Sequence, residues 1–348
     1  MKAAQVTGAG VRVTDVPEPA PRSGQVLAAP LAAGICGSDL HLVQAYEQLG
    51  DAMPPIVLGH EYCARIVEVG PNTPKNLPPG TRVVSVPHAK GPDAIESLGL
   101  SIVLPGAFAE LMVLEHELLL PVPDDLPSEC AALTEPVSVG VHAVATAGVA
   151  KGDVALVIGC GPIGLAVIAA LKVEGHGPVI AADFAPGRRR TAERLGADLV
   201  LDPATDSPYE RWAEFGVTEQ PPSPLLPADL AAAANAGNVV AFECVGVPGV
   251  LDAVIAGVPR HTRVVVVGVC VTPDQITPVN AILKEVTLSF VFAYRQAEFA
   301  RTLDLLANGQ IDGSAFVTDR IGLDGVPDAF KALAHPGDSV KVIADPQS

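Results

Sequence analysis

Residues 154–173 read VALVIGCGPIGLAVIAALKV, and this stretch contains the pattern that is most informative about the fold. It begins with the apolar run VALVI, which is typical of a buried strand. Three glycines follow with the spacing G-x-G-x-x-G, and the apolar run after them is long enough for a helix. The stretch therefore predicts a strand, a tight turn and a helix in direct succession.

The same alternation of strands and helices continues to about residue 290. Strand-like and helix-like runs take turns in PVIAAD (178–183), PGRRRTAERLGA (186–197), DLVLDP (198–203), VVAFECVG (239–246), PGVLDAVIAGV (248–258) and TRVVVVGV (262–269). This alternation is typical of an α/β domain with a doubly wound parallel sheet. A proline-rich stretch at residues 221–229 interrupts it, and we expect that stretch to be a surface insertion.

The first part of the chain has a different texture. Its apolar runs are short and broken by proline and glycine, as in VRVTDV (11–16) and ARIVEVG (64–70), which predicts a β-rich, partly barrel-like domain. A chain of 348 residues also exceeds what one core usually supports. We therefore expect a β-rich domain over residues 1–137, a parallel-sheet domain over 138–290, and the return of residues 291–348 to the first domain.

Composition excludes several classes of function. Acidic residues outnumber basic ones 39 to 22, so the chain repels nucleic acids and anionic membrane surfaces. The N-terminus lacks the apolar run of a signal peptide, and no uncharged apolar stretch reaches the roughly 18 residues that span a bilayer. Six cysteines are spread without a C-x-x-C pair, as expected for reduced thiols or metal ligands. We expect a cytoplasmic protein that binds neither membranes nor nucleic acids.

The glycine-rich turn predicts a dinucleotide site. Gly159 permits the tight turn, Gly161 lets a pyrophosphate approach the backbone, and Gly164 allows the helix to pack closely on the strand. Pro162 and Ile163 open the helix, whose N-terminus would face the phosphates. The alternative, that these glycines are ordinary turn residues, does not account for their position between a strand and a helix.

The strand after this helix ends at Asp183, where a carboxylate would accept hydrogen bonds from the ribose hydroxyls of NAD. The same carboxylate would repel the 2′-phosphate of NADP, so NAD is the expected cofactor. Arginines at 188, 189 and 190 leave some use of NADP open. The arginine run is more typical of a solvated helix face, and only Arg188 is a candidate contact to the adenosine.

Two short segments of the first domain hold candidate metal ligands. GICGSDLH (34–41) contains Cys36, and LGHEY (58–62) contains His60 and Glu61. Cysteine, histidine and glutamate are all zinc ligands. Their spacing alone does not force them together, so a buried thiol and a hydrogen-bonded histidine remain the alternative.

The surrounding segments nevertheless resemble the zinc-dependent medium-chain alcohol and polyol dehydrogenases. The resemblance covers nearly the whole chain in order, through GICGSDLH, VLGHEYCARIVEVG (57–70), PGAFAELMVL (105–114), TEPVSVGVHAV (134–144), VIGCGPIGLAVIAALK (157–172) and FECVG (242–246). It implies a GroES-like catalytic domain joined to a Rossmann domain. It also implies a small-molecule alcohol or ketone substrate and a homodimer or homotetramer.

The resemblance implies that Cys36, His60, Glu61 and Glu135 surround one catalytic zinc. Glu61 is the least certain ligand, because adjacent residues of a strand point to opposite faces, so His60 and Glu61 can both bind only if the backbone turns locally. A carboxylate that orients another ligand is the alternative for Glu61. In the family, a carboxylate at the position of Glu135 is typical of the polyol and butanediol branches, which favours secondary alcohols, vicinal diols or polyols.

The resemblance assigns further roles. Ser38 and His41 would carry the alcohol proton to solvent, and Val269 and Phe292 would lie near the nicotinamide, although core packing is the alternative for both. Asp39 is interpreted as a residue that caps the local backbone. The family's structural zinc needs four closely spaced cysteines, and none lies between Cys63 and Cys130, so we expect no second zinc.

Two other functions remain open from the sequence. A zinc-free, NADPH-dependent quinone or enone reductase can share this two-domain fold. A non-catalytic NAD-binding sensor can also keep the fold without turnover. The retained cysteine, histidine and glutamates favour the zinc enzyme over both.

Overall fold

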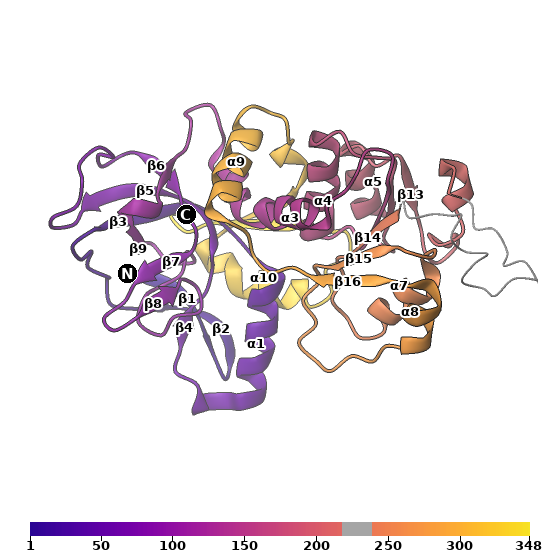
Figure 1. Ribbon diagram of the computed structural model, residues 1–348. Coiled ribbons are helices and arrows are strands. Elements are labelled where there is room, and N and C mark those ends of the chain that lie inside the picture. The colour runs from indigo at the N-terminus through magenta and orange to yellow at the C-terminus, as the bar shows by residue number, and fades with distance from the viewer. Residues whose placement is uncertain (218–238) are drawn as a thin grey trace, which may run out of the picture. The chain divides into compact units, whose positions relative to one another are not determined.

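The computed structural model describes residues 1–217 and 239–348 (Figure 1). It divides into a β-rich unit, Met1–Pro136 with Gln296–Ser348, and a parallel-sheet unit, Val137–Arg295. The boundaries expected from the sequence, after residues 137 and 290, stay predictions of where each domain begins and ends. The proline-rich stretch 221–229 lies outside the described residues.

The parallel-sheet unit confirms the predicted doubly wound α/β fold. Its strands follow the order β13-β12-β11-β14-β15-β16, and every neighbouring pair is parallel. The strands are β11 (Val154–Ile158), β12 (Val179–Ala182), β13 (Leu199–Leu201), β14 (Val239–Glu243), β15 (Arg263–Val266) and β16 (Thr287–Phe290). The helices are α4 (Pro162–Val173), α5 (Pro186–Arg194), α7 (Val250–Gly257) and α8 (Pro278–Lys284), while α3 (Thr134–Ala147) contains the junction between the units.

Strands β11 and β12 are continuous apolar runs. Such runs are expected for central strands of a parallel sheet, because helices cover both faces of the sheet. In Figure 1, α4 and α5 lie on one side of the sheet and α7 and α8 on the other. In register, Ile158 at the end of β11 lies between Ala182 of β12 and Glu243 of β14. The carboxyl ends of these three strands therefore lie at one edge, with the glycine-rich turn.

The β-rich unit is built around a mixed sheet in the order β10-β6-β5-β3-β18-β17, with β9 also paired to β3. Its strands are β3 (Gln25–Gly34), β5 (Glu61–Val69), β6 (Arg82–Val84), β9 (Met112–Glu115), β10 (Leu120–Pro121), β17 (Val317–Gly322) and β18 (Lys341–Asp345). Smaller sheets contain β1 (Lys2–Thr7), β2 (Gly10–Asp15) and β4 (Ile56–Val57), and β7 (His88–Lys90) with β8 (Ile95–Ser97). The helices are α1 (Gly37–Leu49), α2 (Ser128–Ala132), α9 (Gln296–Ala307) and α10 (Val326–Leu333).

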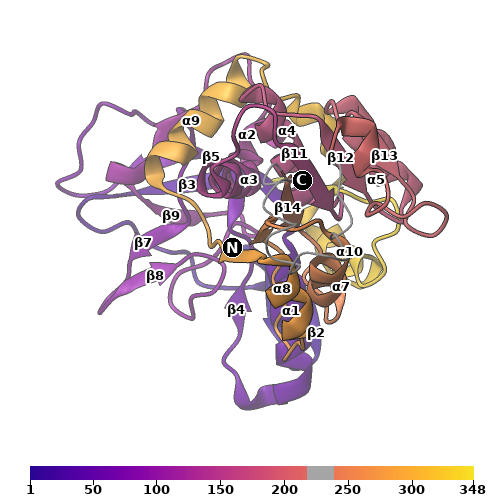
Figure 2. The ribbon, with the colours of Figure 1, turned by 45° about the vertical axis from the view of Figure 1, so that its right-hand side comes forward.

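The end of the chain is an integral part of this unit. Strand β18 pairs antiparallel with β3, with Ile343 opposite Gly34, and β3 pairs with β5, with Gly34 opposite Glu61. Figure 2 shows β3, β5 and β9 side by side. The start of β18 therefore lies beside the end of β3 and the start of β5.

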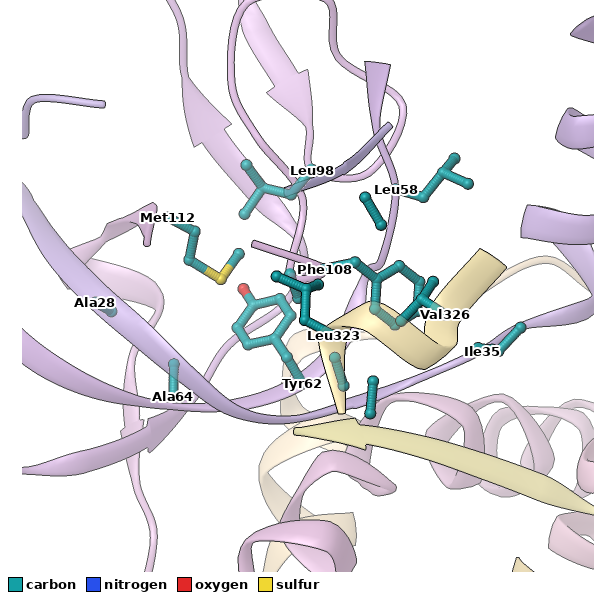
Figure 3. Close-up of a cluster of buried hydrophobic side chains, with 14 of the residues drawn as sticks. Ala28, Ile35, Leu58, Tyr62, Ala64, Leu98, Phe108, Met112, Leu323 and Val326 are labelled. Atoms are coloured by element: carbon teal, nitrogen blue, oxygen red, sulfur yellow. The ribbon is translucent and has the colours of Figure 1, made fainter. Parts of the chain in front are cut away.

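A buried hydrophobic cluster joins the N-terminal strands to the C-terminal segment. Figure 3 shows Tyr62 and Phe108 packed with Leu323 and Val326, which come from the last part of the chain. Phe108 also contacts Phe330 edge to face, with ring centroids 6.1 Å apart. Aromatic contacts of this kind stabilise a core beyond the area that they bury.

The segment between Cys63 and Cys130, which lacks the four cysteines of the family's structural zinc, is held by hydrogen bonds. The buried Glu115 accepts from the backbone N–H of Lys90 at 2.6 Å and from the side chain of Gln25 at 2.7 Å. Ser101 donates to Glu96 at 2.8 Å and accepts from two backbone N–H groups. Across residues 1–217 and 239–348, no helix has the length and apolar character needed to cross a membrane.

Candidate functional site

Cys36 lies at the point where β3 gives way to α1. It is the N-cap of α1, and its backbone N–H donates to the Asp39 carboxylate at 3.0 Å. Asp39 is fully buried, so this cap is held firmly. The thiol of Cys36 is thereby presented beside the first turn of the helix.

A local turn brings His60 and Glu61 to the same place. Gly59 has a φ of +99°, and a side chain there would lie 3.0 Å from the backbone nitrogen of Phe108. His60 therefore precedes β5, which begins at Glu61, so strand alternation does not separate the two side chains. One ligand atom from each of Cys36, His60 and Glu61 lies within 4.8 Å of the others.

These three donors fit a zinc ion. Zinc binds thiolate sulfur at about 2.3 Å, imidazole nitrogen at about 2.0–2.1 Å and carboxylate oxygen at about 2.0–2.2 Å. Donor atoms within 4.8 Å of one another can approach one ion with small side-chain movements. The thiol and the imidazole are half-buried, which limits competition from water.

Asp39 also contacts His60, which sequence reasoning did not predict. Its Oδ1 lies 3.3 Å from His60 Nδ1, and the hydroxyl of Ser38 lies 3.4 Å from Nε2. Burial lowers the pKa of His60, but the charges of Asp39 and Cys36 outweigh it and raise that pKa well above its ordinary value. A carboxylate on one ring nitrogen orients the ring and leaves the other nitrogen for a metal.

Lys341 is the other residue that the sequence analysis missed. Its ammonium donates to both carboxylate oxygens of Glu61 at 2.7 Å and to the carbonyl of Ile35 at 3.0 Å. Both side chains of this ion pair are 1% exposed. Burial lowers the pKa of Lys341, while the charges of Glu61, Cys36 and Glu135 raise it above the ordinary value. The sequence signal that could have identified Lys341 is a lysine at the start of the otherwise apolar strand segment KVIAD.

Glu135 lies in the first turn of α3 and is half-buried. Burial is the main cause of the raised pKa of Tyr62, and the charge of Glu135 adds to it, as it does for the pKa of Lys341, so Glu135 lies within electrostatic reach of both side chains. Among the described residues, however, the group within 4.8 Å contains only the other three predicted ligands. His41, predicted to carry the alcohol proton to solvent, is half-buried on α1, and its Nδ1 has no hydrogen-bond partner in the described part of the chain.

The glycine-rich turn in the parallel-sheet unit has the geometry that a dinucleotide requires. A side chain at Gly164 would overlap the carbonyl oxygen of Gly159, which explains why helix and strand need glycine there. At Gly161 a Cβ would meet, among the described residues, only Arg188, at 3.9 Å, so this part of the chain leaves the backbone open to a ligand. Helix α4 begins directly afterwards, with the half-buried Pro162 and Ile163 in its first turn.

Asp183 lies at the end of β12 beside this turn. Its carboxylate accepts the backbone N–H of Cys160 and of Ala185, both at 2.7 Å. Arg189 donates to two backbone carbonyls here and pairs with Asp202 at 3.0 Å, so it holds the loop together. Arg188 is the member of the arginine run that lies across from Gly161.

Val269 and Phe292 follow strands β15 and β16 of the same unit. Their exposed fractions are 57% and 90%. The alternative interpretation of both as buried core residues is therefore wrong. Their predicted contact with the nicotinamide stays a prediction.

Comparisons with known proteins bear on both units. Residues 162–308 match a zinc-binding dehydrogenase family, and residues 22–124 match an alcohol dehydrogenase GroES-like domain. The chain is 32% identical to (R,R)-butanediol dehydrogenase of Bacillus subtilis over 97% of this chain and 96% of that protein. It is 30% identical to sorbitol dehydrogenase of Bos taurus, over 92% and 89% of the two chains.

Solved structures agree with these matches. The crystal structure of 2R,3R-butanediol dehydrogenase from Bacillus subtilis has a TM-score of 0.81 at 31% identity, covering 99% of both chains. A zinc-binding dehydrogenase from Sinorhizobium meliloti bound to NADP has a TM-score of 0.81 at 26% identity, again over 99% of both chains. The agreement extends over both the GroES-like and the dinucleotide-binding parts.

Proposed function

This chain belongs to the zinc-dependent medium-chain alcohol and polyol dehydrogenases, and from this premise we propose that it transfers a hydride between NAD and a secondary alcohol, vicinal diol or polyol. Membership makes it an oxidoreductase that acts on CH–OH groups. The observation that carries the proposal is the convergence of Cys36, His60 and Glu61 to within 4.8 Å. Relatives named for butanediol and sorbitol support the substrate class.

Cys36 and His60 would hold one catalytic zinc, with Glu135 or Glu61 as a further oxygen donor. When bound, the zinc supplies a Lewis acid that makes a substrate hydroxyl easier to deprotonate. Ser38 is exposed and lies 3.4 Å from His60, so its hydroxyl can accept the substrate proton at this site. His41, on the same helix, would pass that proton toward solvent, because imidazole exchanges protons near neutrality.

NAD is the proposed cofactor. The carboxylate of Asp183 is fixed by two backbone N–H groups beside the glycine-rich turn, which suits it to receive ribose hydroxyls. A 2′-phosphate placed there would meet a negative charge. Arg188 could contact the adenosine side without reversing this preference.

A panel of alcohols tests the proposed substrate class. We expect NAD reduction with 2,3-butanediol or sorbitol, turnover at least about ten-fold slower with ethanol, and a preference for NAD over NADP of about ten-fold or more. Steady-state kinetics with zinc-loaded protein measures this. Reduction of enones with NADPH by zinc-free protein would instead identify a quinone or enone reductase.

The outer edge of the parallel sheet supports a homo-oligomer. Among the described residues β16 ends the strand order, and Phe290 at its end is 72% exposed. Ile282 and Leu283 of α8, the helix that precedes β16 in the chain, are exposed as well. Unpaired strand edges and clustered apolar side chains are typical of protein interfaces. We therefore propose a homodimer or homotetramer that uses this edge. Light scattering should give a dimer or tetramer that Phe290→Asp weakens, and a monomeric native chain at micromolar concentration would contradict it.

The six cysteines are all unpaired thiols. Unpaired cysteines are typical of proteins in reducing compartments. This supports the cytoplasm as the place of action.

A further inference from the structure

A charged residue ends one of the central strands of the parallel sheet. Strand β14 is buried along its whole length, and its last residue, Glu243, is 2% exposed. A buried carboxylate is costly unless hydrogen bonds satisfy it. Here Oε1 accepts the backbone N–H of Val245 at 2.7 Å and of Gly246 at 2.9 Å. The side chain of Glu243 therefore holds the turn that follows its own strand.

Glu243 also holds the turn that follows the neighbouring strand, β15. Its backbone carbonyl accepts the N–H of Val267 at 2.9 Å and of Gly268 at 2.8 Å. A side chain at Gly268 would overlap the backbone nitrogen of Gly246 and would lie 2.9 Å from Oε2 of Glu243. The two turns are thus in direct backbone contact, and the carboxylate lies against both. One residue fixes their position relative to each other.

These turns lie on the part of the sheet edge that the nicotinamide half of NAD would occupy. The strand order places β12 on one side of β11, and β14 and β15 on the other (Figure 1). Asp183, the proposed ribose partner, follows β12, and the glycine-rich turn follows β11. A dinucleotide that crosses the carboxyl edge between β11 and β14, where the strand order reverses, would therefore extend its nicotinamide half over the turns after β14 and β15. Val269, the predicted neighbour of the nicotinamide, directly follows Gly268.

The turn after β14 also contacts the glycine-rich turn. A side chain at Gly159 would lie 2.7 Å from Cγ2 of Val245. The backbone N–H of Cys244 donates to the carbonyl of Ile158 at 2.9 Å. The turns after β11, β14 and β15 are therefore packed in one row along this edge, and Glu243 lies within that row.

We propose that Glu243 is a positioning residue for the nicotinamide half of the cofactor, because it fixes the turns after β14 and β15. This inference rests on the proposed function, since it requires a dinucleotide at the glycine-rich turn. A binding surface that is already ordered loses less conformational entropy when its ligand binds. Removal of the carboxylate leaves the N–H groups of Val245 and Gly246 without their acceptor and lets the two turns relax.

Separate binding of the whole cofactor and of its adenosine half tests the proposal without relying on turnover. NADH, followed by its fluorescence, reports contacts of both halves, whereas ADP, followed by calorimetry, contains only the adenosine and the two phosphates. The carboxylate of Asp183 is held by hydrogen bonds that do not involve Glu243. We therefore expect Glu243→Met to raise the Kd of NADH about ten-fold or more and to leave the Kd of ADP within about two-fold.

Two conservative variants and a matched control complete the test. Glu243→Gln keeps an oxygen acceptor at the same length and should bind NADH nearly as tightly as the native chain. Glu243→Asp is one methylene shorter and should lose contact with Gly246, so it gives a smaller loss of NADH affinity even if Glu243→Met does not fold. In the control, Asp153→Ala, the lost carboxylate is 4% exposed and accepts the N–H of Ala150 at 2.8 Å, just before β11 at the opposite edge of the sheet. This control should leave the ratio of the two Kd values unchanged.

The outcomes separate the two proposals. A native chain that binds neither NADH nor ADP contradicts the proposed function. A native chain that binds both, while the folded Met and Asp variants of Glu243 weaken NADH and ADP by equal factors or weaken neither, overturns only the role of Glu243. Equal weakening is what a purely structural carboxylate would produce.

Discussion

Replacing Cys36 by alanine is expected to remove the bound zinc and to lower kcat/KM for the preferred diol or polyol by about 1,000-fold or more, the scale on which an essential charge-stabilising group is measured. The thiolate is the sulfur donor of the predicted set, and it is held at the N-cap of α1 by the buried Asp39. Without it, His60 and the carboxylates are a weak site for the ion. Zinc content per chain and steady-state kinetics on the same sample measure both effects.

Cys270→Ala is the control for this variant. Cys270 lies in the parallel-sheet unit, where, among the residues that the structure describes, its thiol hydrogen-bonds only with Thr272. It should retain full zinc content and native kinetics. Full activity in Cys36→Ala, or equal loss in both variants, would mean that Cys36 is not a ligand.

The second large effect is expected in the glycine-rich turn. Gly164→Ala forces a methyl group into the carbonyl oxygen of Gly159, so α4 must move away from β11. Overpacking of this kind costs about 1–3 kcal/mol. We expect a lower Tm for the parallel-sheet unit together with loss of measurable NAD binding. Thermal unfolding and NAD titration measure the two effects.

Gly161→Ala is the matched comparison, because it adds the same methyl group where, in residues 1–217 and 239–348, only Arg188 lies within 4 Å, at 3.9 Å. Its Tm should stay close to native, while NAD binds at least about ten-fold more weakly, since the methyl group occupies the approach of the pyrophosphate. Native NAD affinity in Gly161→Ala would show that the dinucleotide does not lie against this turn.

The parallel sheet could be predicted from the sequence because its signals are local. Residues 154–173 contain the run VALVI, the glycine spacing and the helix after it. The residues within each element are enough to predict whether it is a strand, a turn or a helix. The short strands of the β-rich unit are likewise bounded by proline and glycine residues in the sequence, which mark where each strand ends. Patterns of this kind predict elements well, because the period of apolar residues follows from backbone geometry.

The partners of the candidate site could not be predicted, because they depend on long-range pairing. Lys341 and Glu61 are separated by 280 residues and meet only because β18 pairs with β3. Asp39 was interpreted correctly as a cap, but its contact with His60 requires β3 and β5 to be neighbours. No local pattern contains that information.

The position of His60 was uncertain for a related reason. The alternation of side chains along a strand predicted that His60 and Glu61 would point in opposite directions. The turn at Gly59 places His60 before the start of β5, so this alternation does not apply to the pair. This turn needs glycine, because its φ is positive and a side chain there would lie 3.0 Å from the backbone nitrogen of Phe108. The close neighbour at this turn comes from a segment distant in the sequence, so no local pattern around His60 contains it.

Anomalous X-ray scattering at the zinc edge, from crystals grown with zinc, tests the central claim most directly. The account predicts an anomalous peak bonded to the sulfur of Cys36 at about 2.3 Å and to a ring nitrogen of His60 at about 2.0–2.1 Å. An empty site with these side chains turned apart, or zinc bound only elsewhere on the chain, would contradict the account.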